Sequence, residues 1–319
     1  MNRSLLSILL LVASATAQAQ DSRASFSQRT TASATNSAPV KLTVTIVDKR
    51  GRYVTSLSKD QITLLGEKGP LEITSFEQSD QPMSIGVVFD MSRENYAGLL
   101  ASAKVALSHF VRASEQDHRY FIVGFDRNPY LAADWVRTPA EVAAGFDRLA
   151  GVKPSKKATL YDAIQAALAR VGGGPHPKRA IILISDGRDD GSKLKKGELF
   201  EAVRQSDALI YAVSAKRGDA IFTDPSDYLT LDKLCSMSGG YASSASTEAE
   251  FYTFFERLSV ELKNQYSVSF IPANTGGEGG WRRLSFKAKP LELRRTPSSN
   301  VVERIQLSVR GREGYYNKR

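Results

Sequence analysis

Oxygen-bearing side chains follow two apolar runs of the sequence, and a third lies between them at the head of a helical stretch. Asp90 comes directly after the run 84–89, Asp186 directly after the run 180–185, and Thr159 begins the helical stretch. Short apolar runs without polar alternation are typical of strands buried on both faces of a parallel sheet. Ligands of such sheets bind where the carboxyl ends of the strands turn into loops.

Two carboxylates and two hydroxyls would meet at that edge, because Ser92 lies two residues after Asp90. Oxygen ligands of this kind suit a hard divalent cation such as Mg²⁺. A second interpretation stays open: Asp90 and Asp186 can satisfy loop amides or cap helices, and Thr159 can be the N-cap of its own helix. Asp189 and Asp190 favour a solvated loop, and Asp162 is expected to serve the start of its helix.

The beginning of the chain has the pattern of a secretory signal peptide over residues 1–19. A basic start is followed by an apolar run at 5–12 and by small residues with an Ala-x-Ala site. The run is too short for a permanent transmembrane anchor. Residues 20–39 are rich in Ser, Thr, Ala and Gln and predict a flexible linker. We therefore expect an exported protein, periplasmic or extracellular, with no transmembrane anchor after cleavage.

The composition argues against a reactive thiol, a zinc site and a nucleic-acid partner. Cys235 is the only cysteine and lies among apolar helix positions, which favours a buried, inert thiol. The three histidines lack metal-ligand spacing, which argues against zinc. The net charge of +9 is partly concentrated near the C-terminus, on arginines dispersed over segments with strand periodicity. This favours a solvated basic face over a nucleic-acid partner.

The hydrophobic periodicity divides the folded part into three segments. Residues 40–80 and 273–319 alternate with a period of two and predict short strands, whereas 81–272 alternates between strand-like and helical runs. The middle therefore predicts an α/β fold with a doubly wound, mostly parallel sheet, with 130–136 as a short antiparallel edge strand. Neither end has enough strands for independent stability. We expect both ends to pair into one small β domain.

The residues of the predicted site, in order and spacing, resemble the metal-ion-dependent adhesion site (MIDAS) of von Willebrand factor type A domains. The match is Asp90-x-Ser92, then Thr159, then Asp186-Gly187. Further features resemble a bacterial exported subgroup of these domains; they are Val47-Asp48 with Gly51, the helix start 159–164, Gln265-Tyr266 and the ending Gly314-Tyr315-Tyr316.

The resemblance implies a function and a ligand set. Ser92 and Thr159 would donate hydroxyl oxygens to Mg²⁺ or Mn²⁺ directly, while Asp90 and Asp186 would lie close, partly through water. Neutral hydroxyl ligands leave the cation electron-poor, so it can recruit a carboxylate from another protein as its last ligand. The expected function is a non-enzymatic protein-binding module.

One position departs from the family pattern. The motif usually reads Asp-x-Ser-x-Ser, and Glu94 stands at the second serine. Its carboxylate would make the site net negative and repel an acidic partner, occupy the partner's position on the metal, or turn away and leave a site that binds metal poorly. These three consequences stay open.

Two alternative functions follow. The first is a metal-free scaffold for periplasmic or surface assembly with a degenerate site. The second, from a different class, is a metal-assisted phosphohydrolase with Asp90 as nucleophile. Such enzymes need a second carboxylate two residues on, where Ser92 stands, or a lysine that stabilises the phosphate, and the known phosphate-loop, esterase and metalloprotease motifs are absent from the sequence.

Overall fold

The computed structural model describes residues 38–92, 96–114, 116–215, 225–272, 280–294 and 302–317. They belong to one compact unit, Ser37–Arg319. The predicted signal peptide, most of the predicted linker and Glu94 lie outside the described residues.

A six-stranded sheet forms the centre of the larger part, in the order β10-β9-β8-β5-β6-β7. Its strands are β5 (Met83–Asp90), β6 (Arg119–Phe125), β7 (Pro129–Val136), β8 (Lys178–Ile184), β9 (Leu209–Ala215) and β10 (Ala242–Ala245). All neighbours are parallel except β7, which runs antiparallel to β6 at the edge. The predicted mostly parallel sheet and its antiparallel edge strand are confirmed.

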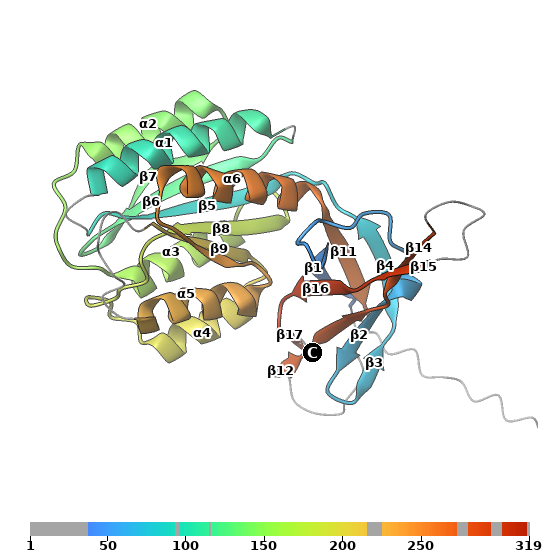
Figure 1. The fold of residues 1–319 in the computed structure, drawn as a ribbon. Coiled ribbons are helices and arrows are strands. Elements are labelled where there is room, and N and C mark those ends of the chain that lie inside the picture. The colour runs from blue at the N-terminus through green and yellow to red at the C-terminus, as the bar shows by residue number, and fades with distance from the viewer. Residues whose placement is uncertain are drawn as a thin grey trace, which may run out of the picture. The chain divides into compact units, whose positions relative to one another are not determined.

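Helices cover both faces of this sheet (Figure 1). On one face lie α1 (Tyr96–Ala113), α2 (Pro139–Ala150) and α6 (Glu248–Lys263). On the other lie α3 (Leu160–Gly172), α4 (Lys196–Gln205) and α5 (Pro225–Ser238). No helix among the described residues is both long enough and apolar enough to span a membrane.

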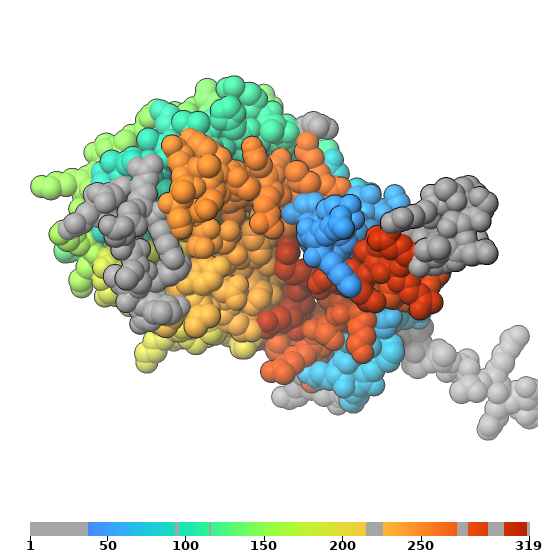
Figure 2. Space-filling view, viewed as in Figure 1, coloured from blue at the N-terminus to red at the C-terminus, as the bar shows by residue number. Residues whose placement is uncertain are grey.

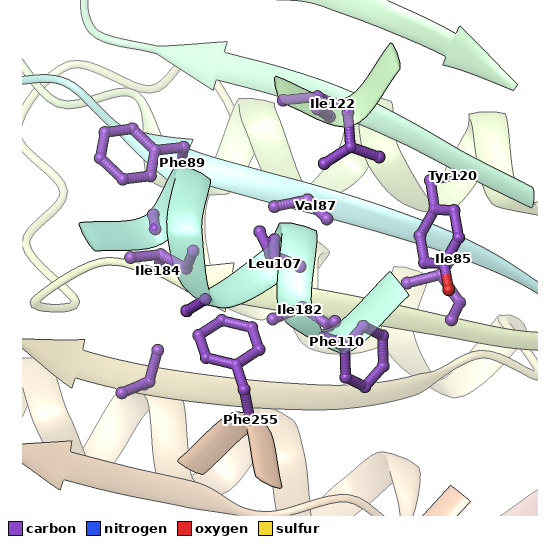
Figure 3. Close-up of a cluster of buried hydrophobic side chains, with 14 of the residues drawn as sticks. Ile85, Val87, Phe89, Leu107, Phe110, Tyr120, Ile122, Ile182, Ile184 and Phe255 are labelled. Atoms are coloured by element: carbon purple, nitrogen blue, oxygen red, sulfur yellow. The ribbon is translucent and has the colours of Figure 1, made fainter. Parts of the chain in front are cut away.

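The core explains why the central strands are apolar throughout. Figure 3 shows Val87 of β5, Leu107 of α1 and Phe255 of α6 in one apolar cluster. Gly86, on the same strand, allows close approach from the opposite side, since a Cβ there would lie 2.3 Å from the Phe121 ring. Every residue of β5 is buried, so its period-two pattern vanishes, as expected for a strand covered on both faces.

The lone thiol behaves as predicted. Cys235 is fully buried in the cluster under α5, and burial raises its pKa well above the usual value. A thiol kept protonated and away from solvent is a poor nucleophile.

Both ends of the described chain build the smaller β part. A four-stranded sheet has the order β16-β1-β11-β4, and a three-stranded sheet has the order β13-β2-β3. The strands are β1 (Val40–Asp48), β2 (Ile62–Gly66), β3 (Gly69–Leu71), β4 (Ile73–Gln78), β11 (Gln265–Phe270), β13 (Ser285–Ala288) and β16 (Leu307–Gly311). Two short pairs, β12 (Trp281–Arg283) with β17 (Gly314–Tyr316) and β14 (Leu291–Arg294) with β15 (Val302–Ile305), and the 3₁₀ turn Lys59–Gln61 complete it.

The pairing confirms that N-terminal and C-terminal strands share one β part. β1 pairs with both β11 and β16, and β2 pairs with β13. Figure 2 shows the blue N-terminal and red C-terminal segments packed against each other. The domain boundaries at 80/81 and 272/273 stay predictions.

A buried carboxylate joins the β part to the helical part. Glu261 of α6 is 1% exposed and accepts hydrogen bonds from Thr45 Oγ1 at 3.2 Å and from Tyr211 Oη at 2.9 Å. Arg310 donates to the same carboxylate at 2.5 Å. Thr45 and Arg310 are register partners across β1 and β16, so the strand pairing presents both to Glu261.

The expectation of a solvated basic face is therefore wrong for two of the C-terminal arginines. Arg310 is about two-thirds buried against Glu261, and Arg312 is half-buried beside the ring of Trp281. The apolar parts of these side chains pack while their charged ends find carbonyls or a carboxylate.

Removing the Arg310 charge should destabilise the protein. Arg310→Met leaves the Glu261 carboxylate buried without its cation, and losing one partner of such a pair costs about 3 kcal/mol of unfolding free energy. Denaturant unfolding measures this. Arg304→Met is the matched control, because Arg304 pairs with Glu292 on the surface with 72% of its side chain exposed, and it should change stability by less than about 1 kcal/mol. Equal effects of the two variants would contradict the role given to Glu261.

A second buried group makes stability depend on pH. His118 precedes β6 and is 7% exposed, and its Nδ1 accepts the backbone N–H of Met83 at 3.0 Å. Burial, and then the nearby Lys178 ammonium, lower the pKa of His118 from 6.5 to about 4. The other charged or titratable groups facing it are Asp80, His176 and Asp117.

The sign follows from which state binds the proton. Between about pH 6.5 and 4 the unfolded chain protonates this histidine and the native state does not, so stability falls as the pH falls through that window. The loss amounts to about 3 kcal/mol. His118→Asn keeps an acceptor for Met83 without a titrating ring, so its unfolding free energy should vary less over the same window. An unchanged pH profile in the variant would refute this assignment.

Candidate functional site

The Asp90 carboxylate is held at the carboxyl end of β5 by three hydrogen bonds. Asp90 is 2% exposed. Its Oδ1 accepts from the Ser92 backbone N–H at 3.0 Å and from the Ser92 hydroxyl at 2.7 Å, and its Oδ2 accepts from the Ser185 hydroxyl at 2.8 Å. These donors compensate for the lost hydration of a buried charge and fix the orientation of the carboxylate.

The neighbouring strand β8 ends in a sharp turn that carries Asp186 at the same edge of the sheet as Asp90, because Phe89 and Ile184 are register partners. Asp186 is 9% exposed, and its Oδ1 accepts the Arg188 backbone N–H at 3.1 Å. Gly187 adopts φ +93°, and a Cβ there would lie 2.4 Å from the carbonyl oxygen of Asp227. Only glycine fits this turn, which is why Asp186-Gly187 occurs as a pair.

Thr159 occupies the N-cap position of α3, but its side chain does not cap the helix. Its hydroxyl donates to the backbone carbonyl of Asp126 at 2.9 Å, and its N–H donates to the same oxygen at 2.8 Å. Asp126 follows β6, which neighbours β5. The hydroxyl proton is thus directed toward the sheet, and the oxygen keeps lone pairs that can accept or coordinate.

The loop after β8 is tied to the start of α3; Asp190 is exposed, as expected of a solvated loop, whereas Asp189 is half-buried. Asp190 Oδ1 accepts the Ala158 N–H at 2.8 Å, and Asp189 Oδ1 accepts the Tyr161 N–H at 3.1 Å. Gly191 lies close enough to Thr159 that a Cβ would be 3.1 Å from its Cγ2. These contacts bring the loop that carries Asp186 against Thr159.

Asp162 corrects another expectation. Its two carboxylate oxygens accept the backbone N–H groups of Lys193 and Leu194, each at 3.0 Å. The residue therefore fixes the loop before α4, and Asp189 accepts the Tyr161 N–H in the first turn of α3.

Ser185 and Arg188 are functional candidates that the sequence analysis missed. Arg188 Nη2 donates to the Lys156 carbonyl at 2.8 Å and lies 3.5 Å from Ser92 Oγ. A positive group thus sits directly beside the predicted ligands. The sequence could have indicated Ser185, because a residue next to Asp186 at a strand end can reach the neighbouring strand. Nothing in the sequence indicated that the Arg188 side chain points toward Ser92.

Within the residues that the structure describes, no group of three or more His, Cys, Asp and Glu side chains is placed to hold a metal ion. A cation at this edge would therefore depend on the hydroxyls of Ser92 and Thr159 as well as on the two carboxylates. This donor set, oxygen atoms alone, is compatible with a hard cation such as Mg²⁺.

The sequence of this region matches a family. The profile of the von Willebrand factor type A domain matches residues 86–188, from β5 to Arg188. The chain contains a von Willebrand factor type A domain. The match includes all four predicted ligands, Asp90, Ser92, Thr159 and Asp186.

Solved structures of low sequence identity also resemble the type A domain chain. Proximal thread matrix protein 1 from the mussel byssus has 17% identity and a TM-score of 0.46, covering 58% of this chain and 49% of its own, and another structure of that protein carries a zinc-occupied MIDAS motif. The chain thus spans about half of the mussel protein.

Two bacterial structures are similar at the same level. The von Willebrand factor domain of the type V pilus tip protein Mfa5 from Porphyromonas gingivalis has 11% identity and a TM-score of 0.43, with 56% and 94% coverage. A von Willebrand factor type A protein from Catenulispora acidiphila has 9% identity and a TM-score of 0.46, with 82% and 76% coverage. Comparison with curated proteins gives no match.

The hydrogen bond from Ser185 to Asp90 should contribute measurably to stability. Ser185→Ala removes a buried donor to a charged acceptor, which costs about 2 kcal/mol of unfolding free energy. Ser236→Ala is the control, because its exposed hydroxyl bonds only to the Lys233 carbonyl of its own helix. Indistinguishable denaturation midpoints for the two variants would show that Asp90 does not depend on Ser185.

Proposed function

We propose that the type A domain is an exported, non-enzymatic protein-binding module with a divalent cation, Mg²⁺ or Mn²⁺, at the carboxyl edge of its parallel sheet. The ligands would be Asp90, Ser92, Thr159 and Asp186. The observation that carries the proposal is the pre-oriented Asp90 carboxylate, which shares the Ser92 hydroxyl at 2.7 Å and so brings two of the four oxygens together.

The chemistry of the set favours recognition of an acidic partner. Two carboxylates balance the charge of a dication, and the neutral hydroxyls of Ser92 and Thr159 leave it electron-poor. A carboxylate of another protein would then complete its coordination. The mussel protein with zinc at its MIDAS motif shows that a distant structural neighbour holds a metal at such a motif.

The phosphohydrolase alternative is less well supported. Enzymes with an aspartyl nucleophile need a second carboxylate two residues on, or a lysine that stabilises the phosphate. Ser92 stands where such enzymes need their second carboxylate.

A metal-free scaffold is the second candidate, and Arg188 is the observation that favours it. Its guanidinium lies 3.5 Å from Ser92 Oγ, at the side of the site where a cation ligated by Ser92 would also lie. A resident positive charge could then stabilise Asp90 and Asp186 in place of a metal ion.

Thermal unfolding in chelator, then with Mg²⁺ and Mn²⁺, separates the two candidates. A ligand that binds only the native state stabilises it by about 2.7 kcal/mol at a concentration of 100 times its dissociation constant. The metal proposal expects this rise in the wild type and its loss in Asp90→Asn. Asp60→Asn, an exposed carboxylate of the 3₁₀ turn, is the control and should keep the rise.

No metal-dependent rise in the wild type would refute the metal proposal and support the scaffold. A variant at the family-deviating position sharpens the test: Glu94→Ser removes one negative charge and should increase the affinity of the metal-loaded protein for an acidic peptide. Unchanged affinity would show that Glu94 does not oppose the partner.

A further inference from the structure

A basic cavity lies at the opposite edge of the parallel sheet from the candidate metal site. Its volume is about 230 Å³. It is lined where β8 and β9 begin and where β1 and β11 of the β part approach them. The charged residues of the lining are Lys41, Lys178, Arg179, Arg312 and Asp207.

The lining thus holds four cationic side chains and one carboxylate, and that carboxylate already forms an ion pair. Asp207 pairs with Arg179 Nη1 at 2.5 Å. Within the described part of the chain, no carboxylate forms an ion pair with Lys41, Lys178 or Arg312. The cavity therefore keeps a strong positive potential that its own residues do not neutralise.

Buried donors in the cavity also lack acceptors. The Nε–H groups of both Arg179 and Arg312 are buried without a hydrogen-bond partner. Arg312 satisfies only Nη2, through the Arg204 carbonyl at 2.8 Å, and Lys178 Nζ donates to the carbonyls of Ser79 and Leu262 at 3.0 and 3.1 Å. An unsatisfied buried donor costs free energy, so these two lining arginines have hydrogen-bonding capacity that their protein surroundings leave unused.

The pKa of Lys178 is shifted in the direction that this arrangement of charges predicts. Burial lowers the pKa of Lys178 to about 8, against the opposing effect of the Asp80 and Glu261 carboxylates, and the Lys41 ammonium makes a smaller contribution in the same direction as burial. Burial also lowers the pKa of Arg312. Both shifts are those of cations removed from water without a full complement of negative charge, and a bound anion would reverse them.

We propose that this cavity binds a phosphate group, because it offers guanidinium and ammonium donors, spare positive charge and the space for a tetrahedral anion. Guanidinium groups match phosphate oxygens geometrically. A phosphate group carries a charge of about −1.5 to −2 at pH 7, which suits three unpaired cations better than one carboxylate does. The volume exceeds several-fold the roughly 30 Å³ that one water occupies, so the group fits with part of its hydration.

Isothermal titration of the full chain with sodium phosphate tests the site, with sodium chloride at matched ionic strength as the reference. Lys41→Gln and Arg312→Gln should each weaken phosphate binding, Arg312→Gln by about tenfold because it removes a charge-assisted donor. Lys41 is exposed, so its variant stays informative if loss of Arg312 impairs folding. Lys49→Gln, an exposed lysine in the turn after β1, is the matched control and should bind like the wild type.

A second titrant identifies the source of the phosphate. Tighter binding of glycerol phosphate than of inorganic phosphate would assign the site to a phosphate ester of a larger molecule, and the reverse order would assign it to the free ion. Wild-type heats no larger than those of chloride, or equal phosphate affinity in the wild type, Lys41→Gln and Arg312→Gln, would overturn the proposal. None of these readouts depends on a metal at the opposite edge of the sheet.

Discussion

The buried carboxylate of Glu261 is the constraint on which the arrangement of the described fold depends. It lies on a helix of the α/β part, yet its partners Thr45 and Arg310 belong to two strands of the β part. Because an uncompensated charge in this position is expensive, the register of β1 against β16 and the position of α6 must be correct together. Tyr211 extends the same network into the parallel sheet. Hydrophobic burial alone would allow small shifts between the two parts, whereas this network specifies one geometry.

The parallel sheet separates two edges of opposite charge. Its carboxyl edge gathers carboxylates and hydroxyls, where Asp90 is held by donors from its own loop and from the next strand. Its amino edge gathers cations, where Lys178 and Arg179 are the first residues of β8. Parallel strands all start at one edge of the sheet and end at the other, so the cationic side chains and the carboxylates lie at opposite edges.

The sequence predicted the features that depend on periodicity and on strand ends. The apolar runs before Asp90 and Asp186 identified adjacent parallel strands, and alternation at both ends of the chain predicted their shared β part. The direction in which a side chain points could not be predicted from the sequence. Nothing local distinguishes Arg310, which turns inward to a carboxylate 49 residues away in sequence, from arginines that stay on the surface.

The loop contacts at the site were missed for the same physical reason. Asp162 accepts the amides of Lys193 and Leu194 in the loop after β8, and Asp189 of that loop accepts the amide of Tyr161 at the start of α3. Such pairings depend on how two loops meet in space, which a single sequence read segment by segment does not contain. Thr159 is the N-cap residue of α3, as the alternative interpretation expected, but its hydroxyl donates to a carbonyl at another strand end and makes no side-chain capping bond.

The interleaving of the β part has a consequence for how the chain reaches its native state. Thr45 and Glu261 are separated by 216 residues, and the register partner of Thr45 on β16 lies still later. During synthesis β1 emerges early, and both of its partner strands, β11 and β16, follow only after residue 264. An unpaired strand edge is open to association with other chains, and contacts this distant in sequence form slowly. Insertion of β1 between β11 and β16 therefore has to wait for the end of the chain, and until then both edges of β1 are open to other chains.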